Sequence, residues 1–250
     1  MPAQEGARKT VSIVRDGVEV LFTVVNPITA WRANSVMSKE PGTVSWIEEF
    51  RSGDVFADIG ANVGLYALCA ARFRGVRTFA FEPESQNYAV LNENIYVNSL
   101  QDTVTGYCVA LSDETRYDSL NLSKFEPGGS CHTFGANLDH QLQPMRPVFR
   151  QGCVATTLDT LVENAVLPVP NHIKIDVDGI EHKVIAGARK TLSDPAVRSV
   201  LVELNTLLDE HWGVVDTMLE HGFTYSEEEA ARARRTSGPF AGTGNYVFRR

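Results

Sequence analysis

Cysteine is scarce in this sequence, and its arrangement excludes the sites that clustered cysteines build. The 250 residues contain four cysteines, Cys69, Cys108, Cys131 and Cys153. None forms a C-x-x-C pair, and no Cys/His cluster has zinc-site spacing. A chain of this length buries roughly 70% of its unfolded surface, so it needs no disulfides to hold a core. We therefore expect reduced, partly buried thiols.

Long apolar runs and excess positive charge are also absent. No run approaches the roughly 18 apolar residues of a membrane helix, and the N-terminus MPAQEGARKT lacks the apolar core of a signal peptide. The formal net charge is −8, which argues against a nucleic-acid partner because phosphate binding relies on Lys and Arg. The sequence predicts a cytoplasmic protein with neither membrane nor nucleic-acid partner; a homodimer is compatible with it.

What the sequence does contain is an alternation of strand and helix patterns. Two β-rich runs in residues 11–25 flank Asp16-Gly17, which favours a tight hairpin, and residues 26–42 are mixed and turn-rich. Periodicity and capping signals predict strands at 55–59, 78–81, 104–111, 172–177 and 197–204, and helices at 43–51, 65–73, 84–98, 158–164, 180–192 and 206–221. Residues 222–225 and 245–248 predict a closing hairpin around the charged segment 227–235.

These elements predict a doubly wound, Rossmann-like α/β domain: a mainly parallel sheet with helices on both faces and an antiparallel edge. We divide the chain into an N-terminal hairpin and cap segment, 1–42, and a main domain, 43–250. Residues 113–152 contain several prolines and glycines and no sustained period. A segment this long predicts a lid or substrate-binding insertion, with short strands such as 119–122 and 148–154.

The strongest chemical signal is the turn DIGANVG after the first predicted sheet strand. Gly60 lets the backbone turn sharply and approach a ligand, and Gly64 lets the helix pack closely. A dinucleotide pyrophosphate favours G-x-G-x-x-G, whereas Asn62 stands where the second glycine would be. Asp58 would repel a pyrophosphate but suits the cationic amino acid end of S-adenosylmethionine. The turn therefore favours the methyl donor over NAD.

Two further strand ends extend this donor site. Glu82, followed by Pro83, lies roughly 20 residues past the glycine turn, where an acid accepts hydrogen bonds from ribose hydroxyls. Ala110, Leu111 and Ser112 end the next strand. In this topology an adenine ring would lie there, with backbone amides and the Ser112 hydroxyl reading its edge. A simple strand exit with a polar turn explains this last segment almost equally well.

The later strands end in acids. Asp176 follows a buried strand and is the best candidate to orient the donor or a substrate hydroxyl, while Asp178 and Glu181 are better explained as helix-capping charges. His182, on the next helix, and His132, in the predicted lid, are candidate general bases. A single histidine on a helix is more often a packing residue.

A divalent metal is an alternative use of these strand ends. Asp176, Glu203 and Asn205 would offer three hard oxygen ligands to Mg²⁺, and the metal would lower the pKa of a hydroxyl nucleophile. Acids at neighbouring strand ends are common without metal, and we assign no metal here.

The motifs DIGANVG, FAFEPESQNYAVLNENI, VALSD, IKIDVDGIEHKVIAGA and LVELN follow one another between residues 40 and 205. In this order they resemble the FkbM family of S-adenosylmethionine-dependent methyltransferases. The resemblance implies a class I methyltransferase fold, a seven-stranded sheet whose last strand is antiparallel, and O-methylation of hydroxyls on polyketides, sugars or related small molecules.

By position, the resemblance matches the glycine turn to the donor loop and Glu82 to the ribose-binding acid. It matches Ser112 and Asp113 to the adenine side, and Asp176 to the fourth strand end. Asp178 departs from the family, which usually has Glu there, so a catalytic role for this carboxylate is less certain. Three rival functions stay open: an NAD-dependent oxidoreductase, a donor-binding partner protein without catalysis, and, against the acidic balance, an RNA methyltransferase.

Overall fold

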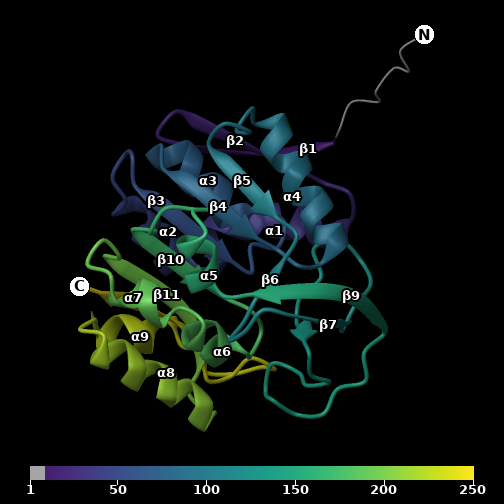
Figure 1. Cartoon of the computed structure of the whole chain (residues 1–250). Helices are drawn as coiled ribbons and strands as arrows, with labels where there is room; N and C mark the ends of the chain where they lie inside the picture. The colour runs from purple at the N-terminus through teal and green to yellow at the C-terminus, as the bar shows by residue number, and fades with distance from the viewer. Residues whose placement is uncertain (1–8) are drawn as a thin grey trace.

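The computed structural model describes residues 9–250 (Figure 1); residues 1–8 of the predicted N-terminal segment lie outside this range. Its main sheet has seven strands in the order β12-β13-β11-β10-β3-β4-β5. Their bounds are β3 Val55–Ile59, β4 Arg77–Phe81, β5 Val104–Tyr107, β10 His172–Ile175, β11 Ser199–Asn205, β12 Thr224–Tyr225 and β13 Thr243–Arg249. Strand β13 runs antiparallel to both its neighbours, β11 and β12. The predicted sheet, with its antiparallel last strand and closing hairpin, is confirmed.

Alternate residues of the strands pack into two separate hydrophobic cores, one on each face of the sheet. In β3, Phe56 joins a core with α1 to α4, while Ala57 joins a core with α5 to α8 on the opposite face. The helices are α1 Pro27–Lys39, α2 Pro41–Glu48, α3 Leu65–Arg74, α4 Ser85–Val97, α5 Leu158–Glu163, α6 Glu181–Ala186, α7 Arg189–Ser193, α8 Asp209–Glu220 and α9 Glu227–Ala233. Strands buried on both faces explain the near-continuous apolar runs of the sequence.

Residues 26–42, expected to be turn-rich, instead form α1 and the start of α2. Asn26 caps α1: its side chain accepts from the Thr29 amide, the Thr29 hydroxyl pairs with the Asn26 backbone, and Pro27 occupies the first turn. This reciprocal cap with a proline at the first helical position is a strong helix start. The predicted hairpin does form, as β1 Thr10–Arg15 and β2 Val18–Thr23. The N-terminal segment is therefore a hairpin followed by two helices.

The segment predicted as a lid is more regular than expected, because it contributes to a second sheet (Figure 1). This sheet has the order β6-β9-β7-β8, with β6 Ala110–Leu111, β7 Arg116–Leu122, β8 Thr133–Phe134 and β9 Phe149–Thr156. The short strands expected near 119–122 and 148–154 are thus confirmed. The strand expected over 104–111 is divided, since its last two residues leave the main sheet and pair with β9.

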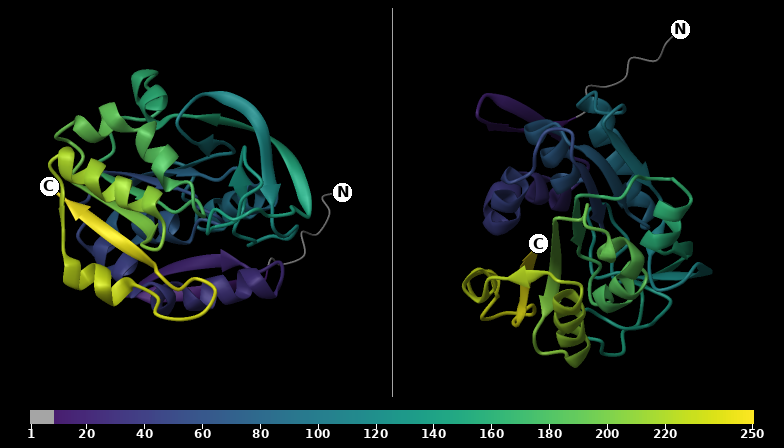
Figure 2. Two further views of the ribbon diagram at one scale, coloured as in Figure 1. Left: turned by 90° about the horizontal axis from the view of Figure 1, so that it is seen from below. Right: turned by 60° about the vertical axis from the view of Figure 1, so that its left-hand side comes forward.

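Two distant parts of the chain meet beside the main sheet. Figure 2 shows the C-terminal strand next to the N-terminal helices, and the Asn245 side-chain amide of β13 donates to Glu40 and Thr43 at the junction of α1 and α2.

The predicted helix 180–192 is split at Gly187, where a side chain would collide with the backbone of Ser112. Within residues 9–250, no helix is both long enough and apolar enough to cross a lipid bilayer.

Candidate active site

The carboxyl ends of β3, β4, β10 and β11 meet at one edge of the main sheet. Gly60, after β3, has a φ of +81°, and a side chain on it would collide with the Asp176 carbonyl after β10. The amides of Gly60 and Ala61 both donate to the Phe81 carbonyl at 3.0 Å. Only glycine allows this left-handed turn together with so close a backbone approach. The glycine turn therefore holds three strand ends against one another.

A narrow crevice, here called the inner crevice, opens along these strand ends. Seven of the ten predicted donor-binding residues line it: Gly60, Asn62, Glu82, Pro83, Ala110, Leu111 and Asp176. Leu120 and Phe134 of the second sheet add apolar walls. One end thus combines carboxylates with backbone amides, and the other is apolar, as a nucleoside with a charged tail requires.

Glu82 is the buried acid of this crevice. Its carboxylate accepts from the Asn62 amide at 2.8 Å and from the Glu84 amide at 2.9 Å. Burial raises its pKa to about 7, although those two amides act to lower it. A carboxylate with further lone pairs facing the crevice can accept hydrogen bonds from ribose hydroxyls.

A turn from the lid segment lies over the crevice and is fixed from several directions. The Gly129 carbonyl accepts from the side chains of Asn62 at 2.7 Å and Asn87 at 3.1 Å, and the Gly128 amide donates to Asn87 at 2.7 Å. Asp178, after β10, accepts from the Cys131 amide at 2.6 Å. Asp178 therefore fastens the lid, which differs from the helix-capping role expected for it. Its pKa is raised to about 6 by burial and by Asp176.

The inner crevice is only about 60 Å³ in volume with the lid in this position. His132 lines it, and the Nε2 atom of this ring is buried without a hydrogen-bond partner among the described residues. Burial lowers the pKa of His132 to about 4, so the ring is neutral. An unpartnered neutral ring nitrogen beside a buried acid fits a nucleoside ligand. Such a ligand requires more room than the crevice offers with the lid in this position.

A second cavity, the outer cleft, adjoins the inner crevice and has a volume of about 350 Å³. Five residues line both spaces: Gly60, Asn62, Ser130, Asp176 and Asp178. Side chains from α1, from β11 and from the segment between α9 and β13 complete the outer cleft, namely Trp31, Arg32, Lys39, Glu203, Arg235 and Phe240. A ligand in the crevice and a ligand in the cleft would meet at Asp176.

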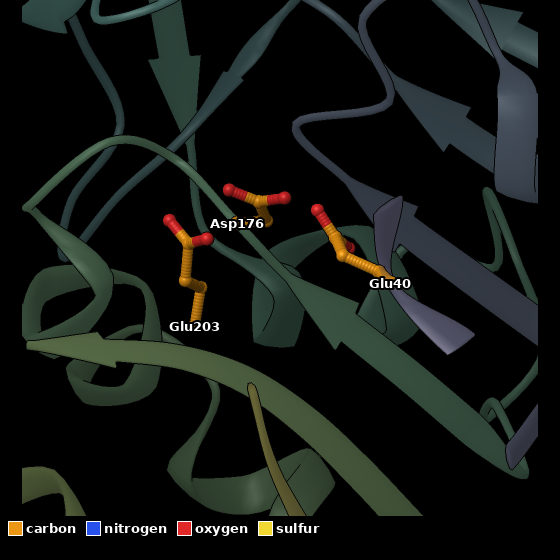
Figure 3. Close-up of side chains that lie close together, drawn as sticks. All are labelled: Glu40, Asp176 and Glu203. Carbon is orange, nitrogen blue, oxygen red and sulfur yellow. The ribbon is translucent and has the colours of Figure 1, made fainter. Parts of the chain in front are cut away.

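Three carboxylates converge between the crevice and the cleft. Figure 3 shows Glu40, Asp176 and Glu203 pointing toward one another, and one oxygen from each lies within 4.8 Å of the others. Burial and the nearby charges of Asp176 and Glu40 raise the pKa of Glu203 well above its ordinary value. Burial acts in the same direction on Glu40, but the positive charges of Lys39 and Lys174 lower its pKa to about 2.

Cations surround this carboxylate cluster. Lys174 Nζ lies 2.9 Å from Asp176 and 3.9 Å from Asp58, and the lysine side chain is 2% exposed. Lys39 Nζ is 2.8 Å from Glu40, and Arg235 Nη2 is 3.4 Å from Glu203. Although burial acts to lower it, the neighbouring carboxylates raise the pKa of Lys174. The cluster is therefore largely neutralised by the protein itself.

Glu40, Asp176 and Glu203 are the residues that could hold a divalent cation here. The set differs from the alternative considered above, because Glu40 takes the place of Asn205. The Asn205 side-chain oxygen accepts from the Leu207 amide at 3.1 Å, and this residue is buried away from the cluster.

Other predicted site residues lie outside both cavities. Asp58 is 1% exposed and faces Lys174, so it does not reach the crevice directly. Gly64 has a φ of +85° and packs against Leu91 of α4. The Ser112 hydroxyl donates to Asp113 at 2.9 Å. None of these three lines the inner crevice, whereas Val109, Ala110 and Leu111 do.

The two predicted bases occupy different places. His132 faces the inner crevice, whereas His182 lies on α6 beside His211, and lines none of the described cavities around the site. A positive charge on Lys183 and burial lower the pKa of His182. Neither histidine lines the outer cleft, so a carboxylate is better placed to receive a proton from a ligand there.

Several residues around the site were not predicted as site residues, although Asn87 and Lys174 lie within the motifs FAFEPESQNYAVLNENI and IKIDVDGIEHKVIAGA. Lys174 sits in the strand IKI, where a charged residue inside an apolar run was the available signal. Asn87 lies in the first turn of α4, and Glu40 precedes a proline between two helices. Trp31 and Arg235 come from segments expected to be irregular. Only the fold brings them to the strand ends.

Comparisons with known proteins identify relatives of this chain. Residues 58–225 match the model of the methyltransferase FkbM domain. The hexuronic acid methyltransferase AglP of Haloferax volcanii is 29% identical over 197 residues, covering 77% of this chain and 73% of that protein. The 31-O-demethyl-FK506 methyltransferase FkbM of Streptomyces tacrolimicus is 29% identical over 222 residues, covering 76% and 84% respectively.

Solved structures support the fold. A methyltransferase FkbM from Methylobacillus flagellatus has a TM-score of 0.53 at 12% identity and covers 91% of this chain, which spans 56% of that protein. Magnesium protoporphyrin IX methyltransferase of Synechocystis, solved with its bound methyl donor, has a TM-score of 0.50 at 12% identity, covering 91% and 85%. The fold is that of class I methyltransferases, and the family model covers most of the chain: this protein belongs to the FkbM family of methyltransferases.

Proposed function

We propose that this protein transfers a methyl group from S-adenosylmethionine to a hydroxyl oxygen of a small molecule. The observation that carries the proposal is the shared wall between the two cavities. The inner crevice has the features of a nucleoside site, and five of its residues also line the outer cleft. A donor in the crevice would therefore present its reactive end to an acceptor in the cleft.

The chain would hold the donor through groups already described. Glu82 would bind the ribose hydroxyls, and Ala110, Leu111 and Phe134 would enclose the adenine. Asp176 and Asp178 would face the positively charged end. S-adenosylmethionine supplies an electrophilic methyl group on a sulfonium, so the protein must chiefly align the acceptor with it.

The acceptor hydroxyl must lose a proton as its oxygen is methylated. Asp176 and Glu203 line the outer cleft and belong to the carboxylate cluster, so either carboxylate can accept that proton. Burial and the neighbouring charges of Asp176 and Glu40 raise the pKa of Glu203, which makes this carboxylate a stronger base than an exposed glutamate. Asp176, at the boundary of both cavities, would orient the reacting oxygen. We favour these carboxylates over His132 and His182 as the base.

The names of the relatives agree with small acceptors. One acts on a hexuronic acid, and the other on an FK506 precursor. Together with an outer cleft of about 350 Å³, they favour a small molecule over a nucleic acid.

The test is an Asp176→Asn variant, which keeps the side-chain size and removes the negative charge. We expect methyl transfer to fall by about 100-fold or more, as for loss of a group acting in the transition state, with a smaller change in S-adenosylhomocysteine affinity measured by calorimetry. Unchanged transfer would overturn the role of Asp176.

Two rival functions have their own outcomes. Tight binding of NAD without binding of S-adenosylhomocysteine would indicate an oxidoreductase. Donor binding with no transfer to any hydroxyl compound would indicate a non-catalytic partner protein.

A further inference from the structure

The lid carries a buried hydrogen-bonding atom that has no partner among the described residues. This atom is Nε2 of His132, whose ring lines the inner crevice. The other ring nitrogen, Nδ1, accepts a hydrogen bond from the backbone amide of Ser123 at 3.3 Å. Because a backbone N–H can only donate, Nδ1 must present a lone pair. In a neutral imidazole the proton then lies on Nε2.

The surroundings of His132 keep its ring neutral. Burial and the positive charges of Arg32 and Lys124 lower the pKa of His132 to about 4. A second ring proton would have to occupy Nδ1, where the Ser123 amide already directs its own hydrogen. Nε2–H is therefore a fixed donor, and it has no lone pair with which to take a proton from an acceptor hydroxyl. This favours a binding role over the role of general base considered above.

His132 and Glu82 line the same crevice, and two residues connect them. Asn62 donates to Glu82 through its backbone amide at 2.8 Å, and its side chain donates to the Gly129 carbonyl at 2.7 Å. Gly129 lies against the imidazole, since a side chain on this glycine would come within 3.1 Å of Nε2. The acceptor Glu82 and the donor His132 thus belong to one hydrogen-bonded unit that joins the lid to the glycine turn.

A pair of neighbouring hydroxyls would satisfy both groups at once. Each hydroxyl donates one hydrogen bond and also offers two lone pairs. The ionised carboxylate of Glu82 can only accept, so it takes the hydroxyl hydrogens and leaves the lone pairs to a donor from another side. The Nε2–H of His132 is a donor of this kind. Without an acceptor, a buried N–H costs about 1–3 kcal/mol.

We infer that His132 is a second ribose-binding residue, whose Nε2–H donates to a ribose hydroxyl oxygen of the methyl donor while Glu82 accepts the hydroxyl hydrogens. The inference rests on the proposed function and deepens it, because it gives the donor site a specificity-determining contact from the lid. The ribose ties the lid to the strand ends, and a nucleoside without that hydroxyl loses this tie.

The test is calorimetric titration of the full chain with S-adenosylhomocysteine and with its 2′-deoxy and 3′-deoxy analogues. His132→Ala removes the ring N–H without adding bulk to the crevice. We expect this variant to bind S-adenosylhomocysteine about 3- to 10-fold more weakly, as for the loss of one hydrogen bond between neutral groups. For one of the two deoxy analogues, which already lacks the partner oxygen, the same substitution should weaken binding by less than about twofold.

Two further variants separate the hydrogen bond from packing. His132→Gln supplies an amide N–H at the end of its side chain, so it should recover part of the lost affinity for S-adenosylhomocysteine. His221→Ala is the matched control, because His221 bonds Ser193 at 3.2 Å and lines neither cavity. It should leave all three affinities unchanged.

NMR of the ring nitrogens gives a readout that does not depend on affinity. In the free protein, we expect His132 to keep a protonated Nε2 and an unprotonated Nδ1 from about pH 5 to 8. S-adenosylhomocysteine should shift the resonance of the Nε2 proton downfield, since that proton gains an acceptor.

Three results would overturn the inference: a proton on Nδ1 in place of Nε2, no loss of affinity in His132→Ala, or an equal loss for S-adenosylhomocysteine and both deoxy analogues. The last of these would indicate that the ring acts by packing alone. If S-adenosylhomocysteine binds and any of these results is found, only the role of His132 is wrong. If S-adenosylhomocysteine does not bind the unmodified chain, the proposed function itself is wrong.

Discussion

Glu82 is the residue on which donor binding should depend most directly. It is 5% exposed, and its carboxylate already accepts hydrogen bonds from two backbone amides beside the glycine turn. Glu82→Gln removes the charge from its hydrogen bonds, and bonds to a charged group contribute about 1.5–3 kcal/mol. We expect S-adenosylhomocysteine affinity, measured by calorimetry, to fall by about 10- to 100-fold. Glu114→Gln, at a side chain 60% exposed, is the control; equal affinities in both variants would contradict the assignment.

Lys174 should matter for stability more than for binding. Its ammonium is buried between Asp176 and Asp58, so Lys174→Met leaves the buried Asp58 and the half-buried Asp176 without their cation. Removing one partner of a buried ion pair typically costs about 3–5 kcal/mol. Urea unfolding should show a loss of this size. Lys190→Met breaks an ion pair with Glu163 whose lysine is 76% exposed, and it should cost far less because water screens an exposed pair. Similar losses of unfolding free energy in the two variants would show that the Lys174 ion pair stabilises the protein no more than an exposed pair does.

The carboxylate cluster allows a prediction about metal. Glu40, Asp176 and Glu203 are close enough to hold a cation, but Lys39, Lys174 and Arg235 already contact them. Adding Mg²⁺ would place a further positive charge among three existing ones. We therefore expect no saturable heat of Mg²⁺ binding in calorimetry, and no loss of methyl transfer after EDTA treatment. Transfer that EDTA abolishes and Mg²⁺ restores would contradict this prediction.

Among the elements, the lid should respond most to the donor. Residues 126–134 are fastened by Asn62, Asn87 and Asp178, which belong to three different strand or helix ends. The crevice beneath them is too small for a nucleoside in its present form. We expect S-adenosylhomocysteine to slow amide hydrogen exchange across 126–134, because the bound ligand would add contacts to that turn. The hairpin 10–23 should exchange at its former rate; protection confined to the hairpin would contradict this role of the lid.

The regular elements were largely predictable because their signals are local. The alternation of strands and helices and the closing hairpin follow from periodicity, capping residues and turn residues. The order of the strands in the sheet was not predicted. Helix α1 was missed although its capping signal, Asn26 and Pro27, is present, since its apolar face is narrow and its sequence polar. The second sheet was only partly foreseen, because β7 and β9 are paired across 26 intervening residues without any turn signal joining them.

The residues of the candidate site also fall into a group that could be predicted from the sequence and a group that could not. Gly60, Asn62, Glu82 and Asp176 follow strands directly, so topology alone gathers them at one edge. Glu40 and Lys174 join them for reasons that no local pattern carries: one ends a helix far earlier in the chain, and the other is a buried lysine matched to Asp58 by strand register. Which side chains surround the strand-end residues depends on tertiary packing, and no short sequence motif encodes that packing.

At the scale of the whole molecule, one sheet separates two apolar cores and carries the acids of the site at one edge. The carboxyl ends of its strands gather the buried Asp58 and Glu82 and the half-buried Asp176 and Asp178, whereas the two large apolar clusters lie on the faces of the sheet. Stability and function are therefore separated in space, and the functional edge is where burial of charge opposes folding.

This arrangement predicts how stability depends on pH in the absence of ligand. Burial raises the pKa of Asp58 and Asp178 to about 6, and that of Glu82 and Glu181 to about 7. The folded protein thus binds these protons more tightly than the unfolded chain, whose carboxyls titrate near 4. Their contribution is fully present below about pH 4 and is lost as the pH rises through 6 to 7.

Glu40 acts in the opposite sense, because its pKa of about 2 removes stability as the pH falls below about 4. His132 and His172 act in the same sense as Glu40: burial lowers the pKa of each to about 4, so only the unfolded chain protonates them between about pH 4 and 6.5.

Because these histidines oppose the raised acids, the contribution of one acid is best isolated by a variant. Glu181→Gln cannot ionise, yet its side-chain oxygen can still accept from the Val177 and Gly179 amides. As the pH rises from 5 to 8, we expect the free energy of unfolding in urea of the unmodified protein to decrease relative to that of Glu181→Gln, by about 1–3 kcal/mol. A difference between the two proteins that stays constant over this pH range would show that Glu181 is not buried as a carboxyl in the folded protein.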